Sequence, residues 1–570
     1  MRRTTQLTLV AILLAAAPGY SQPVGDAAGA SIIPADRRID WRLAGIPGGI
    51  PSRTKLYQTI DAAKYGNGST DATKAIQEAI DSCPAGQVVL LPPGTYTTSD
   101  TVHLRSDRTL RGAGQGKTVI QYQGSGGRSV MDLRGLSHHD IWTLKRSYAI
   151  AGGATKDSRE VTLNTTDGIA VGDVLLIDQL NDGILVDNVG SEGACDYCSR
   201  ENGKRARGQL AEVTAVRGKT VSLNLPMFFS INPSLSPEAM LISARSMVRH
   251  AGVEDLSVTQ AKPVNEFIIE MDSAQYCWLK NVEINRMKRR GAWHINSLQN
   301  EIRACTIRDG IAGFGRDRGY GFQLSLQSTA NLVENNLFHT VDGGGVMTSE
   351  GAIGNVIAYN YLVNIQYDEP HWMVAGPCLN HAAHPSMNLW EGNIGQQIGN
   401  DFIHGSSSHN TLFRCRSAGW RDPRATSNNN AVEFQYRNTS MTVVGCVLGT
   451  NGQSDVYEVA FPQPAPVDLK PIWRLGYGGP NDAGDPNVKA TLLRHGNWDS
   501  VTNNVVWDPS ISDHKLPASL YRSSKPAWWG NLPWPAIGPD VPGMTNKIPA
   551  QVATKASPNG RPQFPKPNPT

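Results

Sequence analysis

The sequence predicts an all-β protein whose main body is a parallel β-helix, a solenoid in which short strands stack from coil to coil. The first observation is a repeat of about 20–30 residues that runs from Val248 onward and combines short apolar strands with turns. The second is the glycine content of 57 residues, which suits many strands and tight turns. Repeats of this length and composition are typical of β-solenoids.

One column of the repeat can be read directly from the sequence. Aligning segments such as CWLKNVEI, LVENNLF and TVVGCVL gives steps of 23, 31, 24, 55 and 31 residues, and the longest step corresponds to two coils. Residues of one column should stack about 4.8 Å apart. Asparagines would then form an amide ladder, and cysteines would fill the interior as small apolar side chains, with disulfides as the alternative. The column consists of Val282, Cys305, Asn336, Asn360, Cys415 and Cys446.

A short helix is expected before the first strands of the repeat. Apolar residues from Ala72 to Ile80 recur at helical spacing, and Asp71 just before them is a favoured N-cap residue. Gln87–Leu91 then has the pattern of a buried strand, which a Pro-Pro-Gly turn ends.

This stretch, DAAKYGNGSTDATKAIQEAIDSCPAGQVVLLPPGTYTTSDTVHLRSDRTLRGAGQGKTVI, resembles the N-terminal segment of the pectate-lyase-like superfamily of right-handed parallel β-helix proteins. The resemblance covers residues 57–122, and it implies a right-handed helix whose open end is capped by the short α-helix. The superfamily includes lyases, hydrolases, epimerases and phage tailspikes, so the resemblance implies a fold and leaves the reaction open.

Composition and pattern divide the chain into six parts. Residues 150–245 form alternating strands with hairpin turns, which predict a small β-barrel or sandwich lobe inserted into the solenoid. The predicted parts are a signal peptide (1–21), an N-terminal extension (22–55), the cap and first coils (56–149), the inserted lobe (150–245), the β-helix core (246–500) and a Trp- and Pro-rich tail (501–570). The tail is expected to cover an edge of the solenoid, with a sugar-stacking platform at Trp528 and Trp529 as the alternative.

The first residues indicate export. Arg2 and Arg3 precede an apolar run from Leu7 to Ala17, and small residues follow before Gln22. This run is too short to span a membrane comfortably, and no other stretch approaches the required length. We therefore expect a secreted or periplasmic protein that does not bind a membrane.

Charge excludes some classes of partner. The formal net charge of +3 is too small to indicate nucleic-acid binding, although it is compatible with an acidic polymer. A glycine-rich segment that ends in Lys117-Thr118 is not a phosphate loop, because Arg111 stands where the motif needs glycine. Cys195 and Cys198 form a CxxC whose expected role is a loop disulfide or free thiols, with half of a zinc site as the alternative. A monomer is expected.

Residue parity in the strands predicts a polar stripe on one outer sheet face. One parity is mostly apolar and is assigned to the core: Ile268, Trp293, Phe322, Leu324, Val346, Ile403, Val432 and Phe434. The other is assigned to the surface: His294, Gln323, Ser325, Met347, Ser349, His404, Glu433 and Gln435. Such a face suits hydrogen bonds to sugar hydroxyls along a polymer, although a merely solvated wall is the alternative.

Residues 367–424 mix histidines and carboxylates more densely than any other segment. His381, His384 and His409 lie there, but Pro385 argues against a helical metal motif. Calcium is possible through carboxylate oxygens, although no repeated Asp pattern defines a site. The candidate catalytic residues are Asp342, Glu391, Asp401, His404, Arg416 and Glu433. The candidate substrate-binding residues are His294, Gln323, Ser349, Trp390, Trp420, Arg421 and Gln435.

Two mechanisms compete for these residues. β-Elimination on a uronate-containing polysaccharide needs a base, for which His404 is the candidate, and a cation such as Arg416 to neutralise the carboxylate. Glycoside hydrolysis needs two carboxylates, for example among Asp342, Glu391, Asp401 and Glu433. The arginine-rich loops favour the lyase slightly, and a non-catalytic carbohydrate-binding or adhesin role is the third alternative.

Overall fold

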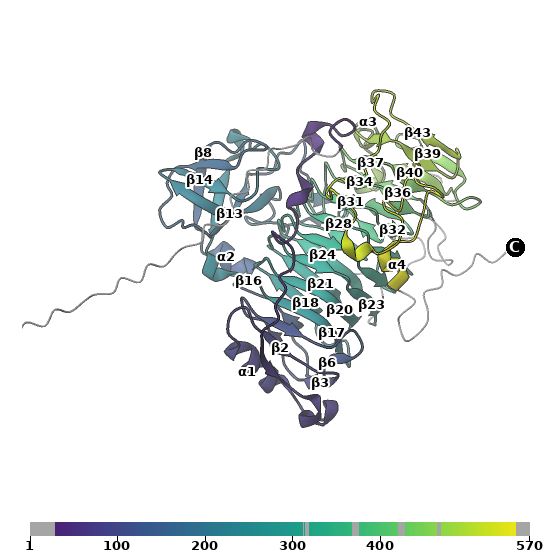
Figure 1. Cartoon of the computed structure of the whole chain (residues 1–570). Helices are drawn as coiled ribbons and strands as arrows, with labels where there is room; N and C mark the ends of the chain where they lie inside the picture. Colours follow the sequence, from purple (N-terminus) through teal and green to yellow (C-terminus); the bar gives the residue numbers. More distant parts are fainter. Residues whose placement is uncertain are drawn as a thin grey trace, which may run out of the picture.

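The computed structural model describes residues 29–311, 313, 318–367, 375–419, 428–463 and 469–553. It confirms the predicted all-β parallel β-helix, whose coils stack along one axis (Figure 1). A smaller β-rich lobe lies beside the stack, and the expected signal peptide at 1–21 falls outside the described residues.

The stack has two long parallel sheets in the described part of the chain. The 11-stranded sheet, called sheet B below, carries the site described later. Its strands in spatial order are β39 (Val456–Ala460), β40 (Pro471–Leu475), β36 (Val432–Phe434), β33 (Ile398–Asn400), β30 (Pro377–Cys378), β27 (Val346–Thr348), β24 (Tyr320–Ser325), β21 (Arg290–Ile295), β18 (Phe267–Asp272), β7 (Ser129–Asp132) and β4 (Val102–His103).

The second sheet, called sheet A, contains 22 of the described strands and is parallel except for its last strand pair, β42–β43. Its strands are β1 (Leu56–Thr59), β2 (Val88–Leu90), β3 (Gly94–Thr98), β5 (Thr109–Arg111), β6 (Thr118–Tyr122), β17 (Gly252–Gln260), β20 (Trp278–Met287), β22 (Glu301–Arg303), β23 (Thr306–Gly310), β25 (Leu332–Glu334), β26 (Leu337–His339), β28 (Val356–Ala358), β29 (Tyr361–Val363), β31 (Leu389–Glu391), β32 (Ile394–Gly395), β34 (Thr411–Phe413), β35 (Arg416–Ser417), β37 (Thr442–Val444), β38 (Val447–Leu448), β41 (Leu493–His495), β42 (Asn497–Asp499) and β43 (Asn504–Val506). Short pairs β11–β12 (Val189–Gly190, Gly193–Ala194) and β16–β19 (Val248–Arg249, Ala274–Gln275) complete the strands outside the lobe.

The solenoid interior is filled by one apolar stack. Alternate residues of each strand point inward. Phe322 and Val346, for example, are register partners on neighbouring strands, and both are fully buried in the interior. The predicted ladder is present: the Asn336 amide donates to Asn360 Oδ1 at 2.9 Å, and the Asn360 amide donates to Asn393 Oδ1 at 3.0 Å. A second ladder runs parallel to it through Asn300, Asn331, Asn355, Asn388 and Asn410. The buried amide groups of each turn are therefore hydrogen-bonded to the asparagine side chains of the next coil.

The first helix, α1 (Thr73–Ser82), packs at the N-terminal end of the stack. Asp71 accepts a hydrogen bond from the Thr73 backbone amide at 2.7 Å and so satisfies one free amide at the start of the helix. Ile76 and Ile80 are buried and join the same core as β2 and β3. The helix thus covers apolar side chains that the first coil would otherwise expose. The other helices are α2 (His138–Thr143), α3 (Asn487–Ala490) and α4 (Pro549–Ala553).

The lobe is a closed barrel of six antiparallel strands with a core of its own. Val161, Val174 and Leu210 are completely buried in it. A long connection between β10 and β13 leaves the barrel and reaches the solenoid. The strands in barrel order are β10 (Val174–Asp178), β13 (Gly208–Arg217), β14 (Thr220–Leu223), β9 (Glu160–Leu163), β8 (Ser147–Gly152) and β15 (Glu238–Ile242).

The segments at both ends of the described chain lie on the outer face of sheet A. The Trp41 indole donates to the Met387 carbonyl at 2.8 Å, and the C-terminal segment covers the same sheet from Leu520 onward. Trp529 is 1% exposed, and its indole donates to the Pro533 carbonyl at 2.9 Å, so it packs inside the fold. Trp528 is half-buried beside Tyr359. The tail is thus a cover over the sheet.

The cysteines divide into one disulfide and a buried set of thiols. Cys195 and Cys198 are bonded, with their Cα atoms 5.4 Å apart. Cys305, Cys415 and Cys446 occupy the interior column, as the repeat alignment predicts. Among the described residues, no helix combines the length and apolar character that crossing a membrane requires.

Candidate functional site

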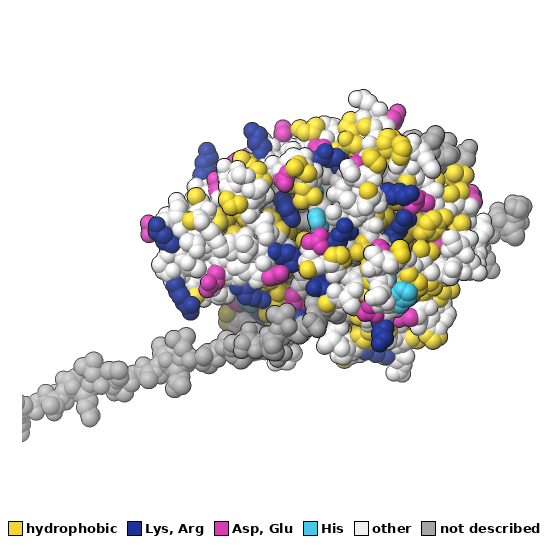
Figure 2. Space-filling model, turned by 90° about the horizontal axis from the view of Figure 1, so that it is seen from above, with side chains coloured by type: hydrophobic (Ala, Val, Ile, Leu, Met, Phe, Trp, Pro, Cys, Tyr) yellow, Lys and Arg dark blue, Asp and Glu magenta, His cyan; other side chains and the backbone are white. Residues whose placement is uncertain are grey.

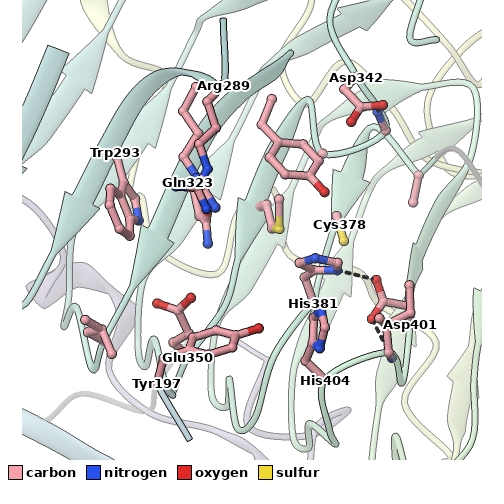
Figure 3. Close-up of a pocket in the computed structure, with 18 of the residues that line it drawn as sticks. Tyr197, Arg289, Trp293, Gln323, Asp342, Glu350, Cys378, His381, Asp401 and His404 are labelled. Carbon is pink, nitrogen blue, oxygen red and sulfur yellow. Dashed lines mark hydrogen bonds and ion pairs between the residues drawn. The ribbon is translucent and has the colours of Figure 1, made fainter. Parts of the chain in front are cut away.

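A pocket of about 710 Å³ lies on the outer face of sheet B, where the barrel approaches the solenoid. Figure 3 shows its side chains converging from several successive coils. The lining residues include three arginines, four histidines and four carboxylates: Arg128, Arg289, Arg290, His138, His139, His381, His404, Glu192, Asp342, Glu350 and Asp401. Tyr197, Trp293, Tyr320, Gln323, Met347, Tyr367 and Cys378 add aromatic, amide and sulfur groups.

The floor of the pocket follows from strand register. Trp293 pairs with Gln323, Gln323 with Met347, and Met347 with Cys378. Because column mates on parallel strands point to the same side, all four side chains face outward toward the barrel side of the sheet. The residues between them in each strand, such as Phe322, point inward and pack in the solenoid core.

A histidine–carboxylate pair forms one wall. The His381 ring nitrogen Nδ1 lies 2.8 Å from Asp401 Oδ2, and Asp401 Oδ1 accepts from the Ile403 amide at 3.0 Å. The two carboxylate oxygens are therefore both used to fix the orientation of the pair. The His404 ring meets His381 edge-on, with 5.1 Å between ring centroids (Figure 3). Such a pair aims the second ring nitrogen of His381 at a defined place, which suits proton transfer.

Arginines form another part of the lining. The Arg290 guanidinium lies 4.8 Å from the centroid of the Trp293 ring and donates through Nε to the Gln323 side chain. The Trp293 indole in turn donates to Ser325 Oγ at 2.9 Å. Stacking on an aromatic face holds the guanidinium plane in a fixed orientation. Arg128 is paired with buried Glu270, so its charge is largely compensated within the protein.

Glu350 is one of three buried carboxylates of the lining, with Asp342 and Asp401. It is 6% exposed, and burial raises the pKa of its carboxyl, while Arg290 and a hydrogen bond from Ser325 act in the opposite direction. Its backbone amide donates to the Ala382 carbonyl at 2.8 Å, which anchors it beside the coil of His381. A carboxyl whose protonated form is favoured can serve as a proton donor.

The barrel connection supplies the remaining wall. Its short hairpin β11–β12 and the disulfide-closed turn after it place Glu192 and Tyr197 on the pocket. The ring centroids of Tyr197 and His404 are 6.0 Å apart. The pocket is therefore shared between solenoid and lobe.

Four of the predicted site residues line this pocket: Gln323, Asp342, Asp401 and His404. Asp342 is held at the start of a turn, where its Oδ1 accepts from the Gly343 amide at 2.7 Å. Among the described residues, no three or more His, Cys, Asp or Glu side chains are grouped so that they could hold a metal ion.

Four predicted substrate-binding residues, His294, Trp390, Ser349 and Gln435, lie outside the pocket and are corrected here. Gln435 accepts a hydrogen bond from the Phe402 amide at 3.1 Å. His294 points into the core, because the register pairs it with Leu324 and pairs Trp293 with Gln323. The parity assigned to this strand was therefore wrong by one residue, which exchanges the two faces. Trp390 is also a fully buried core residue. Ser349 is fully buried and does not line the pocket.

The other candidates outside the pocket have structural partners. Glu391 is buried under the tail, where it accepts from the Leu520 amide at 2.8 Å and from the Tyr359 hydroxyl at 2.5 Å. Glu433 is ion-paired with Arg474 and accepts from Gln435 at 3.1 Å. Arg416 donates to Thr450 Oγ1 at 3.1 Å, and burial lowers the pKa of its guanidinium to about 10. These contacts correct the expectation that the three charged groups face the substrate. Trp420 and Arg421 lie outside the described residues.

Several lining residues were not among the candidates from sequence. His381 lies within the dense segment 367–424, so its neighbourhood was found although the residue was not selected. Glu350 gave no signal beyond its position at a strand end, and Trp293 was assigned to the core. Glu192 and Tyr197 belong to the lobe, which no repeat pattern connects to the solenoid surface. Only the fold brings these groups together.

Fold and site together define a parallel β-helix protein with a polar pocket on the outer face of one sheet. The family model for rhamnogalacturonase A/epimerase, pectate lyase-like, matches residues 61–167, and the model for the right handed beta helix region matches residues 250–384. Both matched segments are thus similar to the pectate-lyase-like superfamily of right-handed parallel β-helix proteins, in agreement with the fold.

Individual relatives are distant. Probable rhamnogalacturonase A of Aspergillus niger is 25% identical over 153 residues, which are 25% of this chain and 34% of that protein. The chain thus spans about a third of the length of the curated relatives it matches. Among solved structures, the tailspike gp61 of Pseudomonas phage phi297 has 12% identity, coverage of 78% and 84%, and a TM-score of 0.40. The polygalacturonase of Erwinia carotovora has 12% identity, coverage of 79% and 93%, and a TM-score of 0.31.

Proposed function

We propose that this chain is a polysaccharide-degrading enzyme that cleaves a uronate-containing polysaccharide by β-elimination in the pocket on sheet B. The observation that carries the proposal is that one pocket combines the stacked guanidinium of Arg290 with the oriented pair His381–Asp401. β-Elimination needs these two functions, a cation for the uronate carboxylate and a base for the neighbouring proton.

The chemistry assigns a part to each group. Arg290, with Gln323 at its side, would bind the uronate carboxylate and stabilise the negative charge that develops on it. His381, held by Asp401, would take the proton from the carbon next to the carboxylate. The electrons of the broken C–H bond form the C=C bond, and the C–O bond to the leaving sugar breaks. Tyr320, whose ring lies 6.0 Å from that of His381, is the candidate that donates a proton to the departing oxygen.

Hydrolysis is the second candidate, and Glu350 favours it. Burial raises the pKa of Glu350, as a general acid for glycoside cleavage requires. Asp342, which lines the same pocket, would then act as the base that activates water. In this mechanism the arginines would serve binding alone.

The names of the Aspergillus niger relatives, rhamnogalacturonases, support a polysaccharide as the substrate. The site also fits an extended ligand, because its lining runs over several coils along the helix axis. A protein with this activity would meet its substrate outside the cytoplasm, so the proposal includes a secreted or periplasmic location, consistent with the export signal expected at 1–21.

One assay on the purified chain separates the mechanisms. The protein is incubated with a panel of neutral and uronate polysaccharides, with and without a calcium chelator. Ultraviolet absorbance of the unsaturated uronate and newly formed reducing ends are followed in parallel. Absorbance that rises with the reducing ends supports elimination, whereas reducing ends without absorbance support hydrolysis. Binding without any cleavage would overturn both and favour a carbohydrate-binding role.

A further inference from the structure

The N-terminal segment 29–55, called the strap below, crosses the solenoid lengthwise on the outer face of sheet A. Figure 1 shows it as the purple trace that descends from the region of α3 toward β2. Near its start, Ser31 Oγ donates to Asp513 Oδ2 at 2.5 Å. Ile33 is buried in the same apolar cluster as Leu520. Both partners belong to the segment that follows the last coil, so the strap begins against the tail.

From there the strap contacts earlier and earlier coils. Its hydrogen bonds to the solenoid, donor first, are Arg37 to the Met441 carbonyl at 3.2 Å, Trp41 to the Met387 carbonyl at 2.8 Å, Gly45 to the Ala330 carbonyl at 2.8 Å, Ile46 to Glu301 Oε1 at 3.2 Å and Arg53 to Thr109 Oγ1 at 3.2 Å. These partners lie on or just before β37, β31, β25, β22 and β5, which belong to successively earlier coils. The Lys55 carbonyl then accepts from the Val88 amide at 3.0 Å, on β2. One short segment therefore bridges late, middle and early coils.

The strap also packs closely on the sheet. Trp41 is 1% exposed and belongs to the apolar cluster that contains Leu389 of β31. A Cβ on Gly45 would lie 2.9 Å from Glu301 Oε1 and 3.0 Å from Leu332 Cβ, so the backbone lies closer to the sheet than a side chain there would allow. Release of the strap would expose this apolar surface and break the hydrogen bonds, so each contact opposes unfolding of the coil beneath it.

A solenoid without such a segment is held together by contacts between neighbouring coils alone. Each coil pairs with the coils directly before and after it, as Val356 pairs with Leu332 on one side and with Leu389 on the other. The end coils have one neighbour each, so they unfold locally at a lower free energy than the middle of the stack. A segment bound to early, middle and late coils removes this independence, because the loss of one coil also frees its part of the segment.

We infer that the strap is a staple that couples the first and last coils, so that the solenoid unfolds as one unit instead of from its ends. The staple closes late in folding, since its partners from Glu301 to Asp513 follow it in the chain and must be in place before it docks. The inference goes beyond the proposed function and does not depend on it, because the strap lies on sheet A and the pocket lies on sheet B.

The test cuts the strap in the folded, full-length chain. A protease recognition sequence is inserted between Gly48 and Gly49, where an added Cβ would meet no atom within 4 Å, and the chain is cleaved after folding. The N-terminal piece then docks as a separate molecule, at micromolar concentration instead of an effective concentration of about 1 mM, so its docking should weaken about 1000-fold. The matched control carries the same insertion between Gly218 and Lys219, in an exposed hairpin turn of the barrel that links no coils.

Hydrogen exchange in increasing urea, followed by mass spectrometry, gives the stability of the end coils and the middle coils separately. Before cleavage, and in the barrel-cut chain, all coils should exchange in one transition. In the strap-cut chain, with the piece removed by gel filtration, the end coils should exchange at lower urea than the middle coils. A synthetic peptide of residues 29–48 at about 1 mM should restore the single transition, whereas the same peptide with Trp41→Ala should not. The inference is overturned if the strap-cut chain keeps a single transition, if the barrel-cut chain loses it as well, or if the peptide fails to restore it.

Discussion

The Nδ1 atom of His381 lies 2.8 Å from Oδ2 of Asp401, and the two residues come from neighbouring coils. Since the Ile403 amide occupies the other carboxylate oxygen, this pair is fixed in one orientation. A fixed imidazole in a pocket with arginines is the feature on which the proposed reaction depends, and it defines the first prediction.

His381→Ala should lower kcat by about 100- to 10,000-fold, the usual contribution of a general base. Asp401→Asn should lower kcat less, since the amide can still contact the imidazole but no longer carries the charge that stabilises it once protonated. Steady-state kinetics on the best uronate polymer measures both. His514→Ala, an exposed histidine of the tail, is the control. Full activity in His381→Ala would show that His381 is not the catalytic base.

Glu350→Gln separates the two mechanisms. If Glu350 is the acid of a hydrolase, the variant should lose about 100-fold or more in kcat. The raised pKa gives the sign of the pH dependence: the acid is active while protonated, so hydrolysis should decline as pH rises through that pKa. In a lyase that uses His381, the variant should retain most of its kcat, and the alkaline decline should be absent. The pH profile of kcat for both chains decides between them.

His294→Leu should stabilise the protein, most strongly in acid. His294 is fully buried, its ring nitrogens have no hydrogen-bond partner among the described residues, and burial lowers its pKa to about 3. The unfolded chain takes up the proton near pH 6.5, whereas the folded chain resists it, so stability is lost as pH falls from about 6.5 toward 3. The full effect is up to about 5 kcal/mol.

Urea unfolding at pH 7, 5 and 4 measures the free energy of unfolding of both chains. The gap between His294→Leu and the unmodified chain should widen as pH falls. Substrate affinity should stay unchanged, because the side chain faces the core. A difference in the free energy of unfolding that is constant with pH would contradict burial of a neutral imidazole. A large change in KM would instead support substrate binding by His294.

The coils were predictable from sequence because the repeat is a local pattern. The column through Cys305, Asn336 and Asn360 required only an aligned repeat, and its amide ladder followed from the fixed spacing of coils. The segment around Asp401 and His404 was found because histidines and carboxylates are dense there, which is also visible in the local sequence. Where the alignment was wrong by one residue, at Trp293 and His294, the inner and outer faces were exchanged.

The rest of the site depends on contacts that no local pattern encodes. Glu192 and Tyr197 reach the pocket because the connection between β10 and β13 packs on Ile403. Glu391 was chosen as a catalytic candidate because it lies in the dense segment 367–424, but a segment that contains Leu520 covers it and donates one of its hydrogen bonds. Long-range packing therefore both adds residues to the site and removes candidates from it.

Glu391 provides the last prediction, since its contacts assign it a structural part. Its carboxylate accepts from the Leu520 amide and the Tyr359 hydroxyl, and burial raises its pKa. Glu391→Ala leaves both donors without acceptors in a buried place and should lower the free energy of unfolding by about 2–4 kcal/mol. Glu391→Gln keeps an acceptor oxygen and the side-chain volume, so its loss should be about half as large. Urea unfolding gives both values, and limited proteolysis should cut the C-terminal segment faster in Glu391→Ala.

Activity per folded molecule should be the same in all three chains, because the pocket lies on sheet B and Glu391 belongs to sheet A. A folded, fully stable Glu391→Ala that has lost activity would instead return this carboxylate to the catalytic candidates.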